Sequence, residues 1–152
     1  MTDEVRARAL QDERLIRRTL YHCARALDYG ENPEQFLDCF TEDGSWWSSR
    51  SGRWNDTPEV RNEGRAQLER WFVESNATRG RAGDFTHHLV WNTLIDLDGD
   101  RAIAESYTAT IGETRHGPQV RSMGRYLDVL VRCRDGAWRL QERRYMCESV
   151  VP

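Results

Sequence analysis

The chain has 152 residues with 22 basic and 25 acidic side chains, a net charge of −3, and 38% of its residues are hydrophobic. One domain is expected over residues 1–152, and the 10% share of aromatic residues argues against disorder. All 22 basic residues are arginine, which excludes Schiff-base chemistry on lysine, and their scatter along the chain argues against binding to nucleic acid.

Two helices are predicted at the start of the chain. Over residues 12–29 the apolar side chains recur at steps of three and four, which is typical of an amphipathic helix, and Gly30 ends it. Asn32 then caps a short helix, which has Pro33 in its first position and runs to residue 40.

The middle of the chain is predicted to hold one strand, one loop and a third helix. Residues 44–48 form the strand, and the loop covers residues 51–58, where Gly, Asn and Pro interrupt regular structure. Gly64 precedes the helix, which covers residues 65–74. The apolar face of this helix holds Leu68, Trp71 and Phe72.

Strands are predicted for the second half, beginning with residues 86–92. Residues 94–103 form a hairpin with an Asp-Gly turn, and residues 125–145 form a second hairpin of the same kind. Helices followed by antiparallel hairpins predict an α+β fold, in which a curved sheet wraps around helices that fill its concave side. Such a cup can hold a small molecule.

The apolar runs are only a few residues long, far short of the roughly 20 that span a membrane. The N-terminus lacks a signal-peptide pattern, so we expect a cytoplasmic protein with no membrane partner. The cysteines show no paired spacing, which predicts neither a zinc site nor a disulfide framework. Buried, reduced thiols are expected at Cys23, Cys39, Cys133 and Cys147.

Seven short segments give the chain a resemblance to a known superfamily. They are YHCARALD at 21–28, FTEDG at 40–44, GR at 64–65, THHLVWN at 86–92, LDGD at 97–100, GRY at 124–126 and DGAW at 135–138. Their order and spacing resemble the SnoaL-like branch of the nuclear transport factor 2-like superfamily, over nearly the whole chain. The resemblance implies a cone-shaped, curved, mostly antiparallel sheet wrapped around three helices, a cystatin-like α+β barrel. This superfamily includes dehydratases, dehydrohalogenases, isomerases, cyclases, dioxygenase β-subunits and non-catalytic binders, so function must be argued from the site.

Asp28 and His88 are the main candidates for catalysis. In the dehydratases and dehydrohalogenases that the chain resembles, an Asp at the end of the first helix orients a His that abstracts a proton, and these two residues match those positions. A carboxylate bonded to one ring nitrogen fixes the tautomer and stabilises the imidazolium. Strand alternation places His88 on one face with Asn92, while His87 points the other way and replaces His88 if a bulge shifts the face.

The alternative is a structural role for both residues, with Asp28 as a polar helix end and His88 as a hydrogen-bonded core histidine. Tyr21 precedes Asp28 by two helical turns, so we expect it on the same helix face as a third catalytic candidate. The resemblance implies a helper Tyr or Lys five residues before Asp28, where this chain has Cys23. We take Cys23 as a substrate-contacting candidate, with core packing as the alternative.

Candidates for substrate binding are the aromatic, polar and arginine side chains of the third helix and the strands. Trp46 and Trp47 face opposite sides of their strand, so at most one lines the cup, and core or interface packing is the alternative. An inward residue among Arg125, Arg143 and Arg144 would polarise a substrate oxygen or bind a leaving group, although outward arginine is commoner. The candidates are Trp47, Trp71, Asn92, Tyr107, Arg125 and Arg144, with Tyr126 as a further hydrogen-bond donor.

These residues predict a lyase or isomerase, of dehydratase or cyclase type, acting on an aromatic or polycyclic substrate such as a polyketide or steroid. The sequence has no Gly-rich phosphate loop, dinucleotide fingerprint or metal triad, so we expect no cofactor and no metal. The alternatives are a non-catalytic β-subunit of a ring-hydroxylating dioxygenase and a small-ligand-binding protein. Because the outer face of a curved sheet commonly needs covering, we expect a homodimer or homotrimer.

Overall fold

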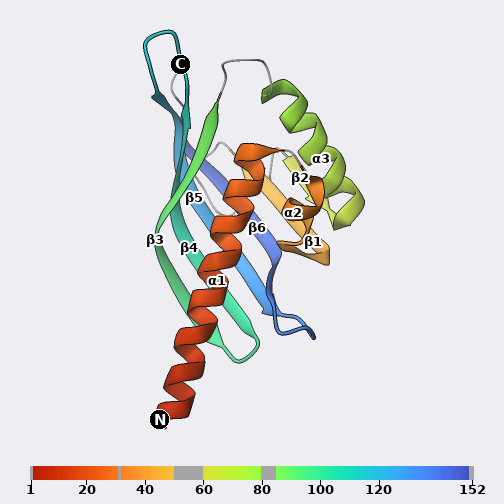
Figure 1. Ribbon diagram of the computed structural model, residues 1–152, viewed down its shortest axis with the longest axis vertical. Helices are drawn as coiled ribbons and strands as arrows, with labels where there is room; N and C mark the ends of the chain where they lie inside the picture. Colours follow the sequence, from red (N-terminus) through yellow and green to blue (C-terminus); the bar gives the residue numbers. More distant parts are fainter. Residues whose placement is uncertain (1, 31, 50–59, 80–84, 151–152) are drawn as a thin grey trace.

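The computed structural model of the protein describes residues 2–30, 32–49, 60–79 and 85–150. Within these residues lie three helices and six strands (Figure 1). In chain order they are α1 (Asp3–Tyr29), α2 (Pro33–Leu37), β1 (Phe40–Ser49), β2 (Val60–Glu63), α3 (Gly64–Arg79), β3 (Thr86–Asp98), β4 (Arg101–Gly112), β5 (Gln119–Arg132) and β6 (Trp138–Val150). The expected loop over residues 51–58 lies outside the described residues.

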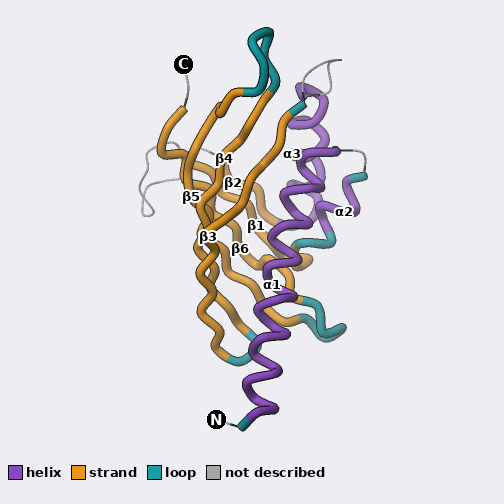
Figure 2. Tube along the Cα trace, turned by 60° about the vertical axis from the view of Figure 1, so that its left-hand side comes forward, coloured by secondary structure: helices purple, strands orange, loops and turns teal. Residues whose placement is uncertain are grey.

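One curved sheet forms the body of the protein, and the helices lie on one of its faces (Figure 2). The strand order is β2-β1-β6-β5-β4-β3, and the pairings are antiparallel except that of β1 with β6, which is parallel. The described strands leave the sheet open, with β2 and β3 at its edges. The predicted α+β fold, a curved and mostly antiparallel sheet around three helices, is therefore confirmed, although the sheet does not close into a barrel.

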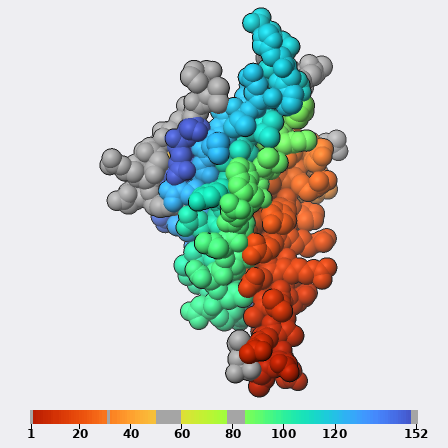
Figure 3. Space-filling view, turned by 90° about the vertical axis from the view of Figure 1, so that its left-hand side faces the viewer, coloured from red at the N-terminus to blue at the C-terminus, as the bar shows by residue number. Residues whose placement is uncertain are grey.

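The first helix is longer than the sequence pattern predicts. Apolar periodicity begins at residue 12, but α1 begins at Asp3, where Thr2 accepts a hydrogen bond from the first turn and acidic residues favour the helix N-terminus. The helix ends as predicted at Gly30, which adopts the left-handed conformation with φ 57°. α1 lies beside the edge strand β3 (Figure 3). No helix in the described part of the chain is long and apolar enough to cross a membrane.

The strands of the second half extend beyond their predicted ranges, and among the register shifts in their pairing two bulges bear on the site. Both predicted turns are present, with Gly99 and Gly136 at φ 59° and 81°. β4 and β5 continue to a further hairpin, and the short β2 was not predicted. In β3 the register shifts between Trp91 and Leu94, and in β6 Gln141 is the extra residue opposite β5. These bulges decide which side chains face the helices.

The hydrophobic core lies between the helices and the sheet. Trp46 of β1 stacks on Trp71 of α3 with 4.8 Å between ring centroids, and Phe36 of α2 stacks on Phe72 of α3 at 4.9 Å. Trp71 remains partly exposed while it contacts these rings. Aromatic side chains from three elements therefore join α2, α3 and β1 into one core.

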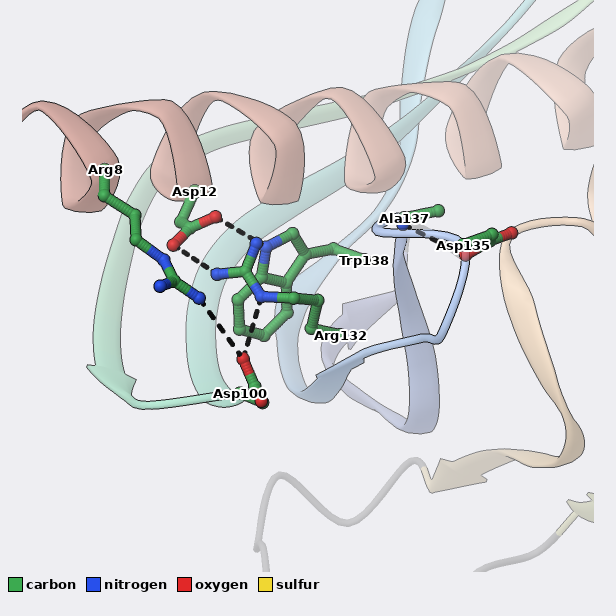
Figure 4. Close-up of polar contacts among 7 residues, drawn as sticks. All are labelled: Arg8, Asp12, Asp100, Arg132, Asp135, Ala137 and Trp138. Atoms are coloured by element: carbon green, nitrogen blue, oxygen red, sulfur yellow. Dashed lines mark hydrogen bonds and ion pairs between the residues drawn. The ribbon is translucent and has the colours of Figure 1, made fainter.

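A buried carboxylate attaches α1 to the sheet near the turns that join β3 to β4 and β5 to β6 (Figure 4). Asp12 is 5% exposed and accepts hydrogen bonds from Trp138 Nε1, at 3.1 Å, and from the Arg132 guanidinium. Arg132 also donates to Asp100 at 2.9 Å, and its guanidinium lies 4.8 Å from the centroid of the Trp138 ring. Burial raises the pKa of Asp12, but the hydrogen bonds from Arg132 and Trp138 outweigh it and hold the pKa below its ordinary value.

We expect Asp12→Asn to lower the free energy of unfolding by about 1.5–3 kcal/mol at pH 7, because hydrogen bonds to a charged group are lost. A lowered carboxyl pKa stabilises the fold above the unfolded pKa of about 3.9, and this stabilisation is lost as the pH falls through the folded value. In urea unfolding, the difference from wild type should therefore shrink below about pH 4. The exposed Asp96 supplies a control, Asp96→Asn, with an expected change within about 0.5 kcal/mol. Equal urea midpoints for Asp12→Asn and wild type at pH 7 would contradict this prediction.

Candidate functional site

The side chains of Asp28 and His88 are in direct contact, as expected from the sequence. Oδ1 of Asp28 lies 2.7 Å from Nδ1 of His88 and also accepts a hydrogen bond from the His88 backbone amide at 2.8 Å. The side chains of Asp28 and His88 are 8% and 11% exposed. In the tautomer in which Nδ1 donates to Asp28, Nε2 carries the lone pair. No side chain or backbone group in the described residues hydrogen-bonds Nε2, so it is available to a bound molecule.

The backbone of β3 explains why His88, and not His87, contacts Asp28. Exposure alternates at the start of this strand, so that His88 is half-buried and His87 is exposed. The His87 ring lies near Tyr29 and Phe85, with centroid distances of 6.3 and 5.0 Å. Asp28 comes from the last turn of α1, which packs on β3. One carboxylate therefore holds both the backbone and the imidazole of His88.

A second polar pair is fully buried between the sheet and the helices. Nε and Nη2 of Arg143 donate to the two carboxylate oxygens of Asp128, both at 2.8 Å, and both side chains are 0% exposed. The guanidinium lies 4.2 Å from the centroid of the Tyr126 ring. Its Nη1 is buried and has no hydrogen-bond partner in the described part of the molecule. Because an unpaired buried donor is unfavourable, Nη1 is suited to an acceptor atom of a bound molecule.

Burial raises the pKa of Asp128, and the charge and hydrogen bonds of Arg143 offset only part of this effect. Ion pairs that are desolvated in this way often stabilise a fold no better than apolar residues of similar volume. A contribution to fold stability is therefore a weak explanation for a buried Asp128–Arg143 pair at this position.

Cys23 of α1 lies next to the Asp128–Arg143 pair. It precedes Asp28 by five residues, about 7.5 Å along the helix axis, and its buried thiol contacts Cys39 and Arg143. Burial raises the pKa of the Cys23 thiol, but the hydrogen bond from Cys39 and the charge of Arg143 bring it below its ordinary value. Burial also raises the pKa of Tyr126 to about 12, so its hydroxyl stays protonated at neutral pH. No group of three or more metal-binding side chains occurs among the residues that the structure describes.

The bulge in β6 reverses which arginine of this strand faces inward. Leu140 is buried before the extra residue Gln141, and Arg143 is buried after it. Without a bulge, period-two alternation from Leu140 would bring Arg144 inward instead. The predicted inward placement of Arg144 is therefore wrong, and Arg143 takes that place.

The predicted placement of Trp47 in the cavity is also wrong. Trp46 is the inward ring of β1, at 4% exposure, and it lies opposite Arg143 in the pairing of β1 with β6. Trp47 lies on the outer face between two guanidinium groups, those of Arg61 and Arg144, which are 4.2 and 4.6 Å from the centre of its ring system. Strand alternation predicted that only one of the two tryptophans faces the helices, and in the structure this residue is Trp46.

Asn92 and Tyr107 are exposed rather than directed at His88. Asn92 belongs to the bulge of β3 and has φ 50°, so the alternation that placed it beside His88 breaks at this residue. Tyr107 is 49% exposed because its neighbours Ser106 and Thr108 occupy the inward positions of β4. Both predicted placements in the cavity are therefore wrong.

Arg125 and Tyr21 also lie outside the region around His88. Arg125 forms ion pairs with Glu105 at 3.3 Å and Glu148 at 2.7 Å, on the face of β5 opposite to the inward Tyr126. Tyr21 is 43% exposed and lines an outer groove of α1. It shares a helix face with Asp28 at a separation of about 10 Å along the axis, and the groove that it lines does not include Asp28.

Sequence reasoning weighed Arg143 without selecting it and did not consider Asp128 as a site residue, although a signal for their pairing exists. Regular pairing outward from the Asp135–Gly136 turn would place Asp128 opposite Glu142, and like charges in directly opposed positions are unfavourable. One extra residue in β6 replaces Glu142 with Arg143 at that position. The charge conflict is therefore a feature of the sequence that favours a bulge in β6.

Comparisons with known proteins extend over most of the chain. The sequence profile of the SnoaL-like domain matches residues 8–144. A structure from Novosphingobium aromaticivorans DSM 12444, assigned as a scytalone dehydratase, superposes with a TM-score of 0.75 at 22% identity, over 94% of this chain and 88% of that one. The likeness at this identity is one of fold. No curated protein matches the sequence.

Two further solved structures differ in what they are said to do. One, assigned as the β subunit of an aromatic-ring-hydroxylating dioxygenase from Novosphingobium aromaticivorans DSM 12444, has a TM-score of 0.77 and 20% identity over 94% of this chain and 93% of its own. The other, from Catenulispora acidiphila, was solved in complex with S-DNPA and has a TM-score of 0.70 and 27% identity over 91% of this chain and 93% of its own.

Proposed function

Because the chain belongs to the SnoaL-like domain family, we propose that it is a cofactor-independent lyase or isomerase in which His88, oriented by Asp28, removes a proton from carbon. The observation that carries this proposal is the contact of Asp28 Oδ1 with His88 Nδ1, which leaves Nε2 free. A histidine ordered in this way is a suitable general base near neutral pH. The similarity in fold to a structure assigned as a scytalone dehydratase supports the same class of reaction.

In this mechanism Nε2 of His88 takes a proton from a carbon next to a carbonyl or a leaving group. Asp28 stabilises the imidazolium that results, through its hydrogen bond to Nδ1. The unpaired Nη1 of Arg143 is the donor for the oxygen on which negative charge develops, or for the leaving group. Return of the proton to another carbon completes an isomerisation, whereas departure of hydroxide with that proton completes a dehydration.

The proposed substrate is aromatic or polycyclic. The buried rings of Trp46 and Tyr126 lie against the Arg143 guanidinium, and we place the apolar body of the substrate next to this aromatic group. The relative from Catenulispora acidiphila that was solved with S-DNPA supports a small organic ligand for this fold. Cys23 and the partly exposed Trp71 remain proposed contacts for that substrate.

A deuterium exchange screen tests the proposal even though the product is unidentified. The protein is incubated in D2O with a panel of hydroxylated and ketone-bearing polycyclic compounds, and mass spectrometry follows deuterium uptake and loss of water. We expect at least one compound to exchange or react with wild type at a rate that His88→Gln does not support and His87→Gln does. Equal rates with His88→Gln would overturn the proposed mechanism.

A second candidate function is that of a non-catalytic β-subunit. The specific observation in its favour is the similarity, over nearly the whole length, to a structure assigned as a dioxygenase β subunit. Stable copurification with a Rieske-type α-subunit, together with no turnover in the exchange screen, would favour this function over the lyase or isomerase.

A further inference from the structure

The outer side of α1 borders a groove that lies away from the Asp28–His88 pair. This groove, the α1–α2 groove, has a volume of about 570 Å³ and runs between α1, α2 and the start of β6. Arg18, His22 and Arg25 line it from α1, and Asp38 lines it from the end of α2. Its volume lies within the range of roughly 300–1,000 Å³ that is usual for small-molecule sites.

The groove carries positive charge that the protein leaves unpaired. Arg18, His22 and Arg25 follow one another at steps of four and three, so their side chains lie in a row along one helix face. Neither Arg18 nor His22 has a hydrogen-bond or ion-pair partner among the described residues. Arg25 lies over the ring of Tyr29, 5.2 Å from its centroid, which leaves its charge uncompensated. In a chain of net charge −3, unpaired cations in a concave site favour an anion.

The rest of the groove is suited to an apolar body. Leu15, Ala26 and the edge of the nearly buried Trp138 line it beneath the two arginines. Asp38, on the opposite wall, would repel a second negative charge on the same ligand. These contacts favour an amphipathic molecule with one acidic group over a polyanion.

We propose that the α1–α2 groove binds a small organic anion with one acidic group, which Arg18 and Arg25 hold while its apolar body rests on Leu15 and Trp138. Arginine is suited to this task because its planar guanidinium binds carboxylate, sulfonate or phosphate groups through two parallel hydrogen bonds. The groove side chains lie on the outer face of α1, whereas Ile16 and Leu20 point into the core. Binding there is therefore independent of His88.

Two fluorescent probes with the same ring system test this proposal. The first, 8-anilinonaphthalene-1-sulfonate, carries a sulfonate, and the second, N-phenyl-1-naphthylamine, has no charge. We expect Arg18→Gln/Arg25→Gln to raise the dissociation constant of the sulfonate at least tenfold and to change that of the neutral probe less than twofold. The control Arg6→Gln/Arg70→Gln removes the same charge from exposed positions outside the groove and should leave both constants within twofold of wild type.

Two results would overturn the proposal. One is a sulfonate dissociation constant that stays within twofold of wild type in Arg18→Gln/Arg25→Gln. The other is loss of sulfonate binding in His88→Gln, which would place the anion on the concave side of the sheet instead. Equal thermal unfolding midpoints for the two double variants exclude a loss of fold as the cause of weaker binding.

Discussion

His88→Gln is expected to lower kcat/KM by about 10²–10⁴-fold for a substrate found in the exchange screen, because a positioned general base contributes that much to proton transfer. Glutamine fills a similar volume and can still hydrogen-bond to Asp28, but it has no titratable nitrogen to accept a proton. The matched control is His87→Gln on the adjacent, exposed residue, which should keep kcat/KM within about threefold of wild type.

Asp28→Asn separates the orienting role of the carboxylate from its structural role. Asparagine keeps an oxygen for the His88 backbone amide, which Asp28 now binds at 2.8 Å, but removes the charge that stabilises the imidazolium. We expect Asp28→Asn to raise the activation free energy of turnover by more than it lowers the free energy of unfolding. The double variant His88→Gln/Asp28→Asn should turn over little more slowly than His88→Gln alone. If the fold losses in kcat of the two single variants multiplied in the double variant, Asp28 and His88 would act independently, which would contradict the proposed coupling.

The largest effect on stability is expected at the buried Asp128–Arg143 pair. Arg143→Met leaves the Asp128 carboxylate, which is 0% exposed, without its partner, and should lower the free energy of unfolding by about 3–5 kcal/mol in urea or guanidinium. The double variant Asp128→Leu/Arg143→Met removes both charges and should recover most of that loss, since apolar residues often replace a buried ion pair without a net penalty.

Activity distinguishes the two roles of this pair. In the double variant the fold is expected to return but the turnover is not, because the free Nη1 donor of Arg143 is gone. A double variant as active as wild type would show that the pair has only a structural role. A double variant as unstable as Arg143→Met would contradict the view that the unpaired carboxylate causes the instability.

Local sequence patterns were sufficient to predict many of the helices, strands and turns of this fold. The helix before Gly30 and the two Asp-Gly hairpins depend on periodicity and on glycines with positive φ, both of which are visible in the chain. The first turns of α1 were missed because their large apolar residues, Val5 and Leu10, are exposed and form no apolar stripe, and the Thr2 cap defines the start of the helix instead. β2 was missed because four residues are too few to establish alternation.

Site residues close to the end of a helix or the start of a strand could be predicted from the sequence. Site residues that lie at or beyond a β-bulge could not, because the bulge changes the face on which they lie. The pairing of Asp28 with His88 was implied by the resemblance to the family, and their positions at the end of a helix and the start of a strand could be predicted from local pattern. Asn92 was assigned by alternation and Arg144 as one of three strand arginines that could point inward, and both assignments failed at an extra residue that shifts the later side chains to the other face. The evidence for a bulge lies in which residues of the neighbouring strand would be directly opposed, and the sequence of the bulged strand alone does not reveal it.

The bulge of β3 also governs which changes in length this strand can tolerate. His88 and Thr93 face the same side although an even number of residues lies between them, which a regular strand does not allow. Deleting Asn92 would remove the extra residue and restore regular alternation, so that Leu94, now 74% exposed, stays outward and the partly buried Ile95 stays inward. Inserting a second residue at the bulge would instead turn the side chains on one side of it to the opposite face of the sheet. At this one place β3 can therefore lose a residue without inverting either half of the strand, but cannot gain one.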